Sequence, residues 1–66
     1  MKIVVDGEPA EVAAGLTVAG LLQAREEPAR HVLVEVNGEY VAPGQLEHRI
    51  LVEGDRVEVI LPAFGG

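Results

Sequence analysis

The chain has 66 residues, a net charge of −6 and no cysteine. A chain of this length forms one small domain that buries only about 60% of the surface its unfolded form exposes, so little interior is left for an active-site cavity. The size therefore argues against an enzyme. The absence of cysteine excludes disulfides, thiolate chemistry and cysteine-based metal sites.

The acidic charge also narrows the range of partners. Eleven acidic residues against five basic ones repel phosphate backbones and anionic lipid surfaces, so we expect neither nucleic acid nor membrane as a partner. The same charge favours a partner with a basic docking patch. The opening residues lack the basic start and long apolar stretch of a signal peptide. We expect a soluble protein of the cytoplasm.

The first twelve residues, "MKIVVDGEPAEV", predict two strands joined at Asp6-Gly7, because glycine accepts the positive φ of a tight hairpin turn. Residues 15–28, "GLTVAGLLQAREEP", then predict a helix that Thr17 caps and Pro28 ends. Gly20 inside this helix costs about 1 kcal/mol relative to alanine, which suggests that the sheet passes close to it. The apolar face of the helix consists of Val18, Leu21 and Leu22.

Residues 31–41, "HVLVEVNGEYV", predict a strand, a turn at Asn37-Gly38 and a short returning strand at Tyr40-Val41. The turn-rich residues 42–55 form an irregular connector. Residues 56–62, "RVEVILP", predict a last strand, since Pro62 cannot continue a regular ladder. The residues expected to face the helix are Ile3, Val5, Val32, Val34, Val36, Val57, Val59 and Leu61.

The element order is strand, strand, helix, strand, short strand, strand. One amphipathic helix across one face of a mixed sheet is the economical way to bury these valines. We therefore expect an α+β fold of the β-grasp, ubiquitin-like type, with a mixed sheet of four to five strands packed on one main helix. Residues 1–62 form the domain, and residues 63–66 form a flexible tail that ends in Gly-Gly.

Three motifs carry a resemblance to a known family. They are the central "VEVNGEYV", the "VEGDRVEVILP" near the end and the terminal Gly65-Gly66. With them, the chain resembles the thiamine-biosynthesis sulfur carriers, the ThiS family, along nearly its full length. The related molybdopterin-pathway carriers, the MoaD family, are the alternative, and a ubiquitin-like protein modifier or interaction module is a third reading.

The resemblance implies that Gly66 carries the chemistry. Its carboxylate is adenylated with ATP by a partner enzyme of the ThiF type, related to E1 enzymes, because a free carboxylate is a poor electrophile. A sulfur donor such as a cysteine desulfurase then supplies the sulfur of a thiocarboxylate, which a ThiG-type thiazole synthase consumes. The chain is thus a co-substrate and not an enzyme, and it binds no cofactor itself. The final acceptor stays open between thiamine thiazole, a pterin cofactor, cysteine and a tRNA base.

The residues before Gly66 are interpreted as the part that enters the partner. Gly65 has no Cβ and permits close backbone approach in a narrow channel. Phe64 stands where small or aliphatic residues are common in these carriers, and it is either a docking anchor or a cover for the sheet edge. We assign Gly65 and Phe64 to the threading of the tail.

Strand alternation also predicts a docking surface. If the inward residues face the helix, then Val4, Leu33 and Ile60 lie on the other side of the sheet. Three aliphatic side chains on an otherwise acidic face are typical of a protein interface, although scattered surface apolar residues are also normal.

Other polar residues give no comparable signal. His31 and His48 are far apart in sequence and have no cysteine or organised carboxylates beside them, so we expect no metal site. The acidic residues Glu26, Glu27 and Glu47 are interpreted as a solvated surface and not as catalytic carboxylates.

Overall fold

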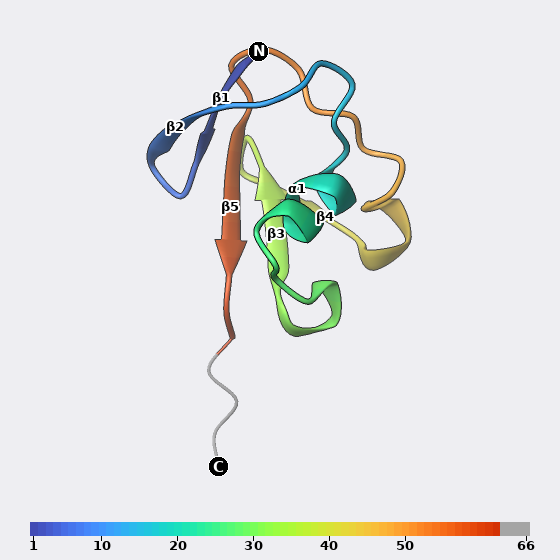
Figure 1. Cartoon of the computed structure of the whole chain (residues 1–66). Helices are drawn as coiled ribbons and strands as arrows, with labels where there is room; N and C mark the ends of the chain where they lie inside the picture. Colours follow the sequence, from blue (N-terminus) through green and yellow to red (C-terminus); the bar gives the residue numbers. More distant parts are fainter. Residues whose placement is uncertain (63–66) are drawn as a thin grey trace.

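The computed structural model describes residues 1–62 of the chain. It contains the predicted elements in the predicted order (Figure 1). The strands are β1 (Lys2–Val5), β2 (Glu8–Glu11), β3 (Leu33–Val36), β4 (Glu39–Val41) and β5 (Arg56–Ile60); the helix is α1 (Val18–Ala24), and two 3₁₀ turns are η1 (Ala29–His31) and η2 (Pro43–Gln45).

The two predicted hairpin turns are both confirmed, and they share one geometry. Asp6 and Gly7 have φ values of 50° and 81°, and Asn37 and Gly38 have φ values of 54° and 81°. Two consecutive residues with positive φ are the mark of a type I′ turn, whose twist matches that of the strands it joins. The local choice of residues thus fixes the register of both hairpins.

The strands form one mixed sheet in the order β2-β1-β5-β3-β4. β1 and β5 are parallel, whereas the other neighbouring strands are antiparallel. β5 therefore lies in the centre of the sheet, and α1 packs across one face (Figure 1). This is the expected α+β arrangement, a ubiquitin-like β-grasp.

The start and the apolar face of α1 agree with the prediction. Thr17 is the N-cap, and its hydroxyl accepts a hydrogen bond of 3.0 Å from the backbone N–H of Gly20. This bond satisfies one of the free amide groups at the helix start. The residues that α1 buries against the sheet are the predicted Val18, Leu21 and Leu22.

The prediction for the end of α1 is wrong. The helix ends at Ala24, four residues before Pro28, and Glu26 takes a left-handed φ of 57°. The left-handed residue turns the chain away, so the proline has no helix to interrupt. In residues 1–62 no helix is long and apolar enough to cross a membrane.

The suggested reason for Gly20 is also wrong. A Cβ at this position would lie 2.8 Å from Cδ1 of Leu16, and neither of the other near atoms belongs to the sheet. The glycine thus makes room for the side chain of Leu16, which folds over the first turn of α1.

The core contains most of the predicted apolar residues together with several from the connector. Val59 is only half-buried, and Leu61 is 71% exposed, so its predicted place against the helix is wrong. Val41, Leu46 and Leu51 are buried although the sequence pattern did not assign them to the core. The residues that were predicted to face the core and are buried there are Ile3, Val5, Val18, Leu21, Leu22, Val32, Val34, Val36 and Val57.

Candidate functional site

The C-terminal segment, residues 61–66, begins where β5 ends. Phe64, Gly65 and Gly66 lie outside the described residues, so their roles in threading and modification, and the separation of a tail from the domain, stay predictions. The part of the site that the structure describes is the surface around the start of this segment. β5 ends at the opposite end of the sheet from the N-terminus (Figure 1).

Two of the three predicted docking residues lie side by side at this end of the sheet. Leu33 and Ile60 are direct partners in the antiparallel pairing of β3 with β5. Their side chains are 43% and 37% exposed. Their neighbours Val34 and Val59 pack on the core, so alternation places Leu33 and Ile60 on the outer face, the side of the sheet away from α1.

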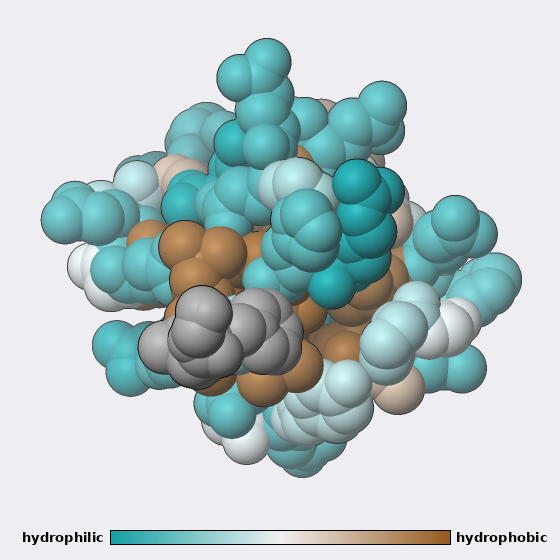
Figure 2. Space-filling model, turned by 90° about the horizontal axis from the view of Figure 1, so that it is seen from below, coloured by the Kyte–Doolittle hydropathy of each residue, from teal (hydrophilic) through white to brown (hydrophobic). Residues whose placement is uncertain are grey.

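Leu61, which follows Ile60 in the chain, is an exposed apolar residue. β5 ends at Ile60, so the alternation that would have turned Leu61 towards α1 no longer applies to it. Seen from the end of β5, brown apolar surface gathers around the centre of the molecule and hydrophilic surface surrounds it (Figure 2). The chain therefore leaves the sheet through an apolar surface with a polar rim, a composition typical of protein interfaces.

Val4, the third predicted docking residue, lies elsewhere on the sheet. It is half-buried and pairs with Arg56 at the start of β5. Ile60 lies four positions further along the extended strand than Arg56, a distance of about 13 Å. The structure thus brings Leu33 and Ile60 together and leaves Val4 apart from them.

An acidic row crosses the outer face next to the apolar pair. Glu35 is the direct partner of Glu58 between β3 and β5, and Tyr40 is the partner of Glu35 between β4 and β3. Within residues 1–62 neither glutamate forms an ion pair. Like charges directly opposite each other destabilise a sheet, so this row has a cost in the free protein.

A hollow of about 510 Å³ opens beside Leu33, between β3, β4 and the two 3₁₀ turns. Buried apolar side chains line its floor, and Arg30 and Tyr40 lie among the residues around it. The recess continues the apolar surface of the Leu33–Ile60 pair towards the edge of the sheet.

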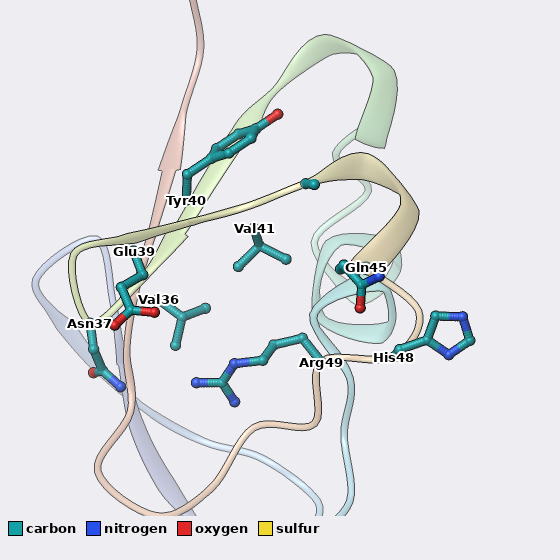
Figure 3. Close-up of a pocket in the computed structure, with 9 residues that line it drawn as sticks. Val36, Asn37, Glu39, Tyr40, Val41, Gln45, His48 and Arg49 are labelled. Carbon is teal, nitrogen blue, oxygen red and sulfur yellow. The ribbon is translucent and has the colours of Figure 1, made fainter.

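A second hollow, of about 430 Å³, lies between the β3–β4 turn and the connector (Figure 3). The side chain of Arg49 points into it, whereas His48 points away from the other side chains. An Arg49 nitrogen (Nη1) lies 3.5 Å from an Asp55 carboxylate oxygen. The positive charge of Arg49 in this hollow is therefore already paired with Asp55.

Asp55 is a buried polar residue that the sequence did not single out. Its side chain is almost fully buried and accepts hydrogen bonds of 2.9 Å from the Asn37 amide nitrogen and from the Val52 N–H. Burial raises the pKa of Asp55, but the Val52 and Asn37 hydrogen bonds and the Arg49 charge outweigh it and hold the pKa below its usual value. Asp55 thus connects the β3–β4 turn to the start of β5 through its hydrogen bond with Asn37.

The histidines and acidic residues that the sequence set aside form no common site. Within residues 1–62 no group of three or more metal-ligating side chains comes together. Glu27 accepts a hydrogen bond of 2.7 Å from Arg25, and His31 accepts one of 3.3 Å from Arg30. These are surface contacts, which contribute little to stability.

Comparisons with known proteins agree with the fold. The model of the ThiS family matches residues 3–66. A crystal structure of the thiamine biosynthesis protein ThiS from Geobacter metallireducens is 35% identical, with all of both chains covered and a TM-score of 0.88. A solution structure of a thiamine biosynthesis protein from the same organism is also 35% identical, with 100% of this chain and 88% of that chain covered and a TM-score of 0.82. No curated protein matched the chain.

The fold and the comparisons together define a small ubiquitin-like carrier protein. The chain belongs to the ThiS family.

Proposed function

We propose that this protein is a sulfur carrier of thiamine biosynthesis and that Gly66 is its reactive residue. The observation that carries the proposal is the family match, which extends through the terminal Gly-Gly to residue 66. The β-grasp domain is the part that partner enzymes recognise, and the end of the chain carries the functional group.

The chemistry proceeds in two steps at one carboxylate. An oxygen of the Gly66 carboxylate attacks ATP in the partner's active site, and pyrophosphate leaves as the acyl-adenylate forms. In the second step, the terminal sulfur of a persulfide, delivered by a donor such as a cysteine desulfurase, displaces AMP to form an acyl disulfide; a thiol of the partner then attacks the S–S bond, which forms a disulfide and releases the thiocarboxylate. A ThiG-type thiazole synthase takes the sulfur. In this scheme ATP binds to the ThiF-type activating enzyme and catalysis belongs to the partners.

The outer face supports docking to the activating enzyme. The exposed Leu33–Ile60 pair and Leu61 lie at the start of the C-terminal segment, and the Glu35–Glu58 row lies beside them. An apolar patch next to two carboxylates that form no ion pair within the described part of the chain fits a partner surface with aliphatic anchors and a basic rim. Val4 lies too far away to share an anchor with this pair, so its contribution to docking is separate.

Intact mass spectrometry distinguishes this function from the alternatives. The protein is incubated with an activating enzyme of the ThiF type, ATP and a sulfur donor. A carrier gains the mass difference between sulfur and oxygen at its C-terminus, whereas a protein modifier becomes joined to lysine side chains and an inert module stays unchanged. Transfer of the labelled sulfur to a thiazole, and not to molybdopterin, separates the ThiS-type from the MoaD-type carrier. No gain of sulfur in the unmodified chain would refute the proposal.

A further inference from the structure

The side chain of Asp6 holds the last part of β5 in place. Its Oδ1 accepts a hydrogen bond of 2.8 Å from the backbone N–H of Val59, which lies 53 residues further along the chain. Asp6 also belongs to the first hairpin turn. One carboxylate thus connects the first turn of the protein with the strand that leads to its C-terminus.

This contact replaces a missing step of the parallel ladder. The N–H groups of Val4 and Asp6 donate to the carbonyls of Asp55 and Val57, both at 2.9 Å. In a regular parallel pair, the backbone carbonyl of residue 6 would next accept from Val59. The chain instead turns at Asp6, where φ is 50°, and the carboxylate takes the position of the backbone acceptor.

The other carboxylate oxygen of Asp6 is held by Arg25, the residue that directly follows α1. Nη2 of Arg25 lies 3.3 Å from Oδ2 of Asp6, and Nε of Arg25 lies 2.7 Å from Glu27. The planar guanidinium thereby bridges two carboxylates and limits the rotation of the Asp6 side chain. The group that receives the Val59 N–H is therefore oriented from two sides.

Among residues 1–62, the Val59 contact marks the last place where both edges of β5 are held. Towards β3, Ile60 pairs with Leu33; towards β1, Asp6 binds Val59. Beyond these two residues comes the C-terminal segment. Loss of the Asp6 contact would free the β1-side edge of β5 from Val57 onwards and leave the pairing with β3 to hold Val59 and Ile60.

We propose that Asp6 is a positioning residue that fixes the base from which Gly66 is presented to the activating enzyme. The proposal rests on the carrier function proposed above. A partner that threads the C-terminal segment must order each residue that is free beforehand, and one more free residue weakens binding by about fivefold or more. Asp6 lowers this cost by holding the β1-side edge of Val59 before the partner arrives, while β3 holds Ile60.

Two substitutions at one position test the proposal. Asp6→Gly removes the acceptor without strain, because glycine tolerates the left-handed φ. Asp6→Asn keeps an oxygen that can accept from Val59 but removes the charge. Hydrogen exchange of the Val59 amide reports the contact, and the amide of Leu51, which donates to Leu16 at 2.8 Å, reports the stability of the whole domain.

In Asp6→Gly we expect Val59 to exchange about tenfold faster relative to Leu51. The KM of the carrier in adenylation should rise about fivefold at an unchanged kcat, and Asp6→Asn should restore most of both values. Unchanged Val59 exchange, or faster exchange with an unchanged KM, overturns the inference. Failure of the unsubstituted chain to be adenylated overturns the carrier function instead, so the two failures are distinguishable.

Discussion

Glu35 and Glu58 lie directly opposite each other on neighbouring strands at the centre of the sheet. Cross-strand carboxylates of this kind repel each other, and the repulsion costs a few tenths of a kcal/mol or more. The pair adjoins the exposed Leu33–Ile60 pair, at the place where the chain leaves the sheet. A cost of this kind at an exposed surface is offset if a basic group of a partner binds between the two carboxylates.

Glu58→Lys should therefore have opposite effects on the free domain and on the complex. The new cation opposite Glu35 should stabilise the free domain by about 0.5 kcal/mol, measured by urea denaturation. The same change should weaken binding to the activating enzyme severalfold, measured by calorimetry at moderate salt. Tighter binding of the lysine variant would show that the partner presents no basic group here.

The apolar pair should act as the anchor of docking. Leu33→Asp and Ile60→Asp should each weaken binding to the activating enzyme severalfold or more, because interface anchors often contribute over about 1 kcal/mol. Both side chains are partly exposed, so the stability should change little. Val52, which is 55% exposed in the connector, provides the matched control as Val52→Asp. Equal affinity in all three variants would mean that the partner recognises another surface.

The terminus should be essential for the chemistry and dispensable for the fold. Deletion of Gly66, or replacement of Gly65 by a bulky residue such as tryptophan, should abolish adenylation because the carboxylate no longer reaches the reacting phosphate. Circular dichroism and the urea midpoint should stay as in the original chain, since the described residues form a core of their own. The prediction fails if either variant still forms the thiocarboxylate at an undiminished rate.

Asp55 should make the stability depend on pH at the acid end. Its folded pKa is lowered, so the unfolded chain binds its proton first as the pH falls. The carboxylate thus contributes stability that is fully present above the unfolded pKa of about 3.9 and is lost as the pH falls through the lower folded value. Urea unfolding between pH 7 and pH 2.5 measures this loss.

Two Asp55 variants separate the charge from the hydrogen bonds. Asp55→Asn should flatten the acid end of the stability curve, because it removes the titrating group. Asp55→Ala should lower the free energy of unfolding by roughly 3 kcal/mol at neutral pH, because the Asn37 amide and the Val52 N–H lose their acceptor. Acid curves of equal slope for the original chain and Asp55→Asn would contradict the pKa argument.

The elements whose structure is decided by neighbouring residues were predictable from sequence. Asp6-Gly7 and Asn37-Gly38 identify their turns because few residue pairs accept two positive φ values in succession. Thr17 identifies the helix start for a similar reason, since a free amide needs a nearby acceptor. These signals were sufficient to place both hairpins and the start of α1.

The features that depend on distant contacts were not predictable in the same way. Leu46 and Leu51 lie in a turn-rich connector without periodicity, and only its folding over the sheet buries them. Asp55 resembles any acidic turn residue until Asn37 and Arg49 are seen around it. Alternation places the three predicted docking residues on the outer face, but their separation into a pair and a distant Val4 depends on strand register.

The parallel pairing of β1 with β5 has a consequence for the synthesis of the protein. Val5 lies beside Val57 in the sheet, so the strand at the centre is the last one in the chain. The first hairpin and α1 leave the ribosome before β5, the strand that joins β1 to β3 in the sheet. Long-range pairings of this kind form late and slowly. An enzyme that recognises the outer face therefore meets that face only on chains whose last strand is in place.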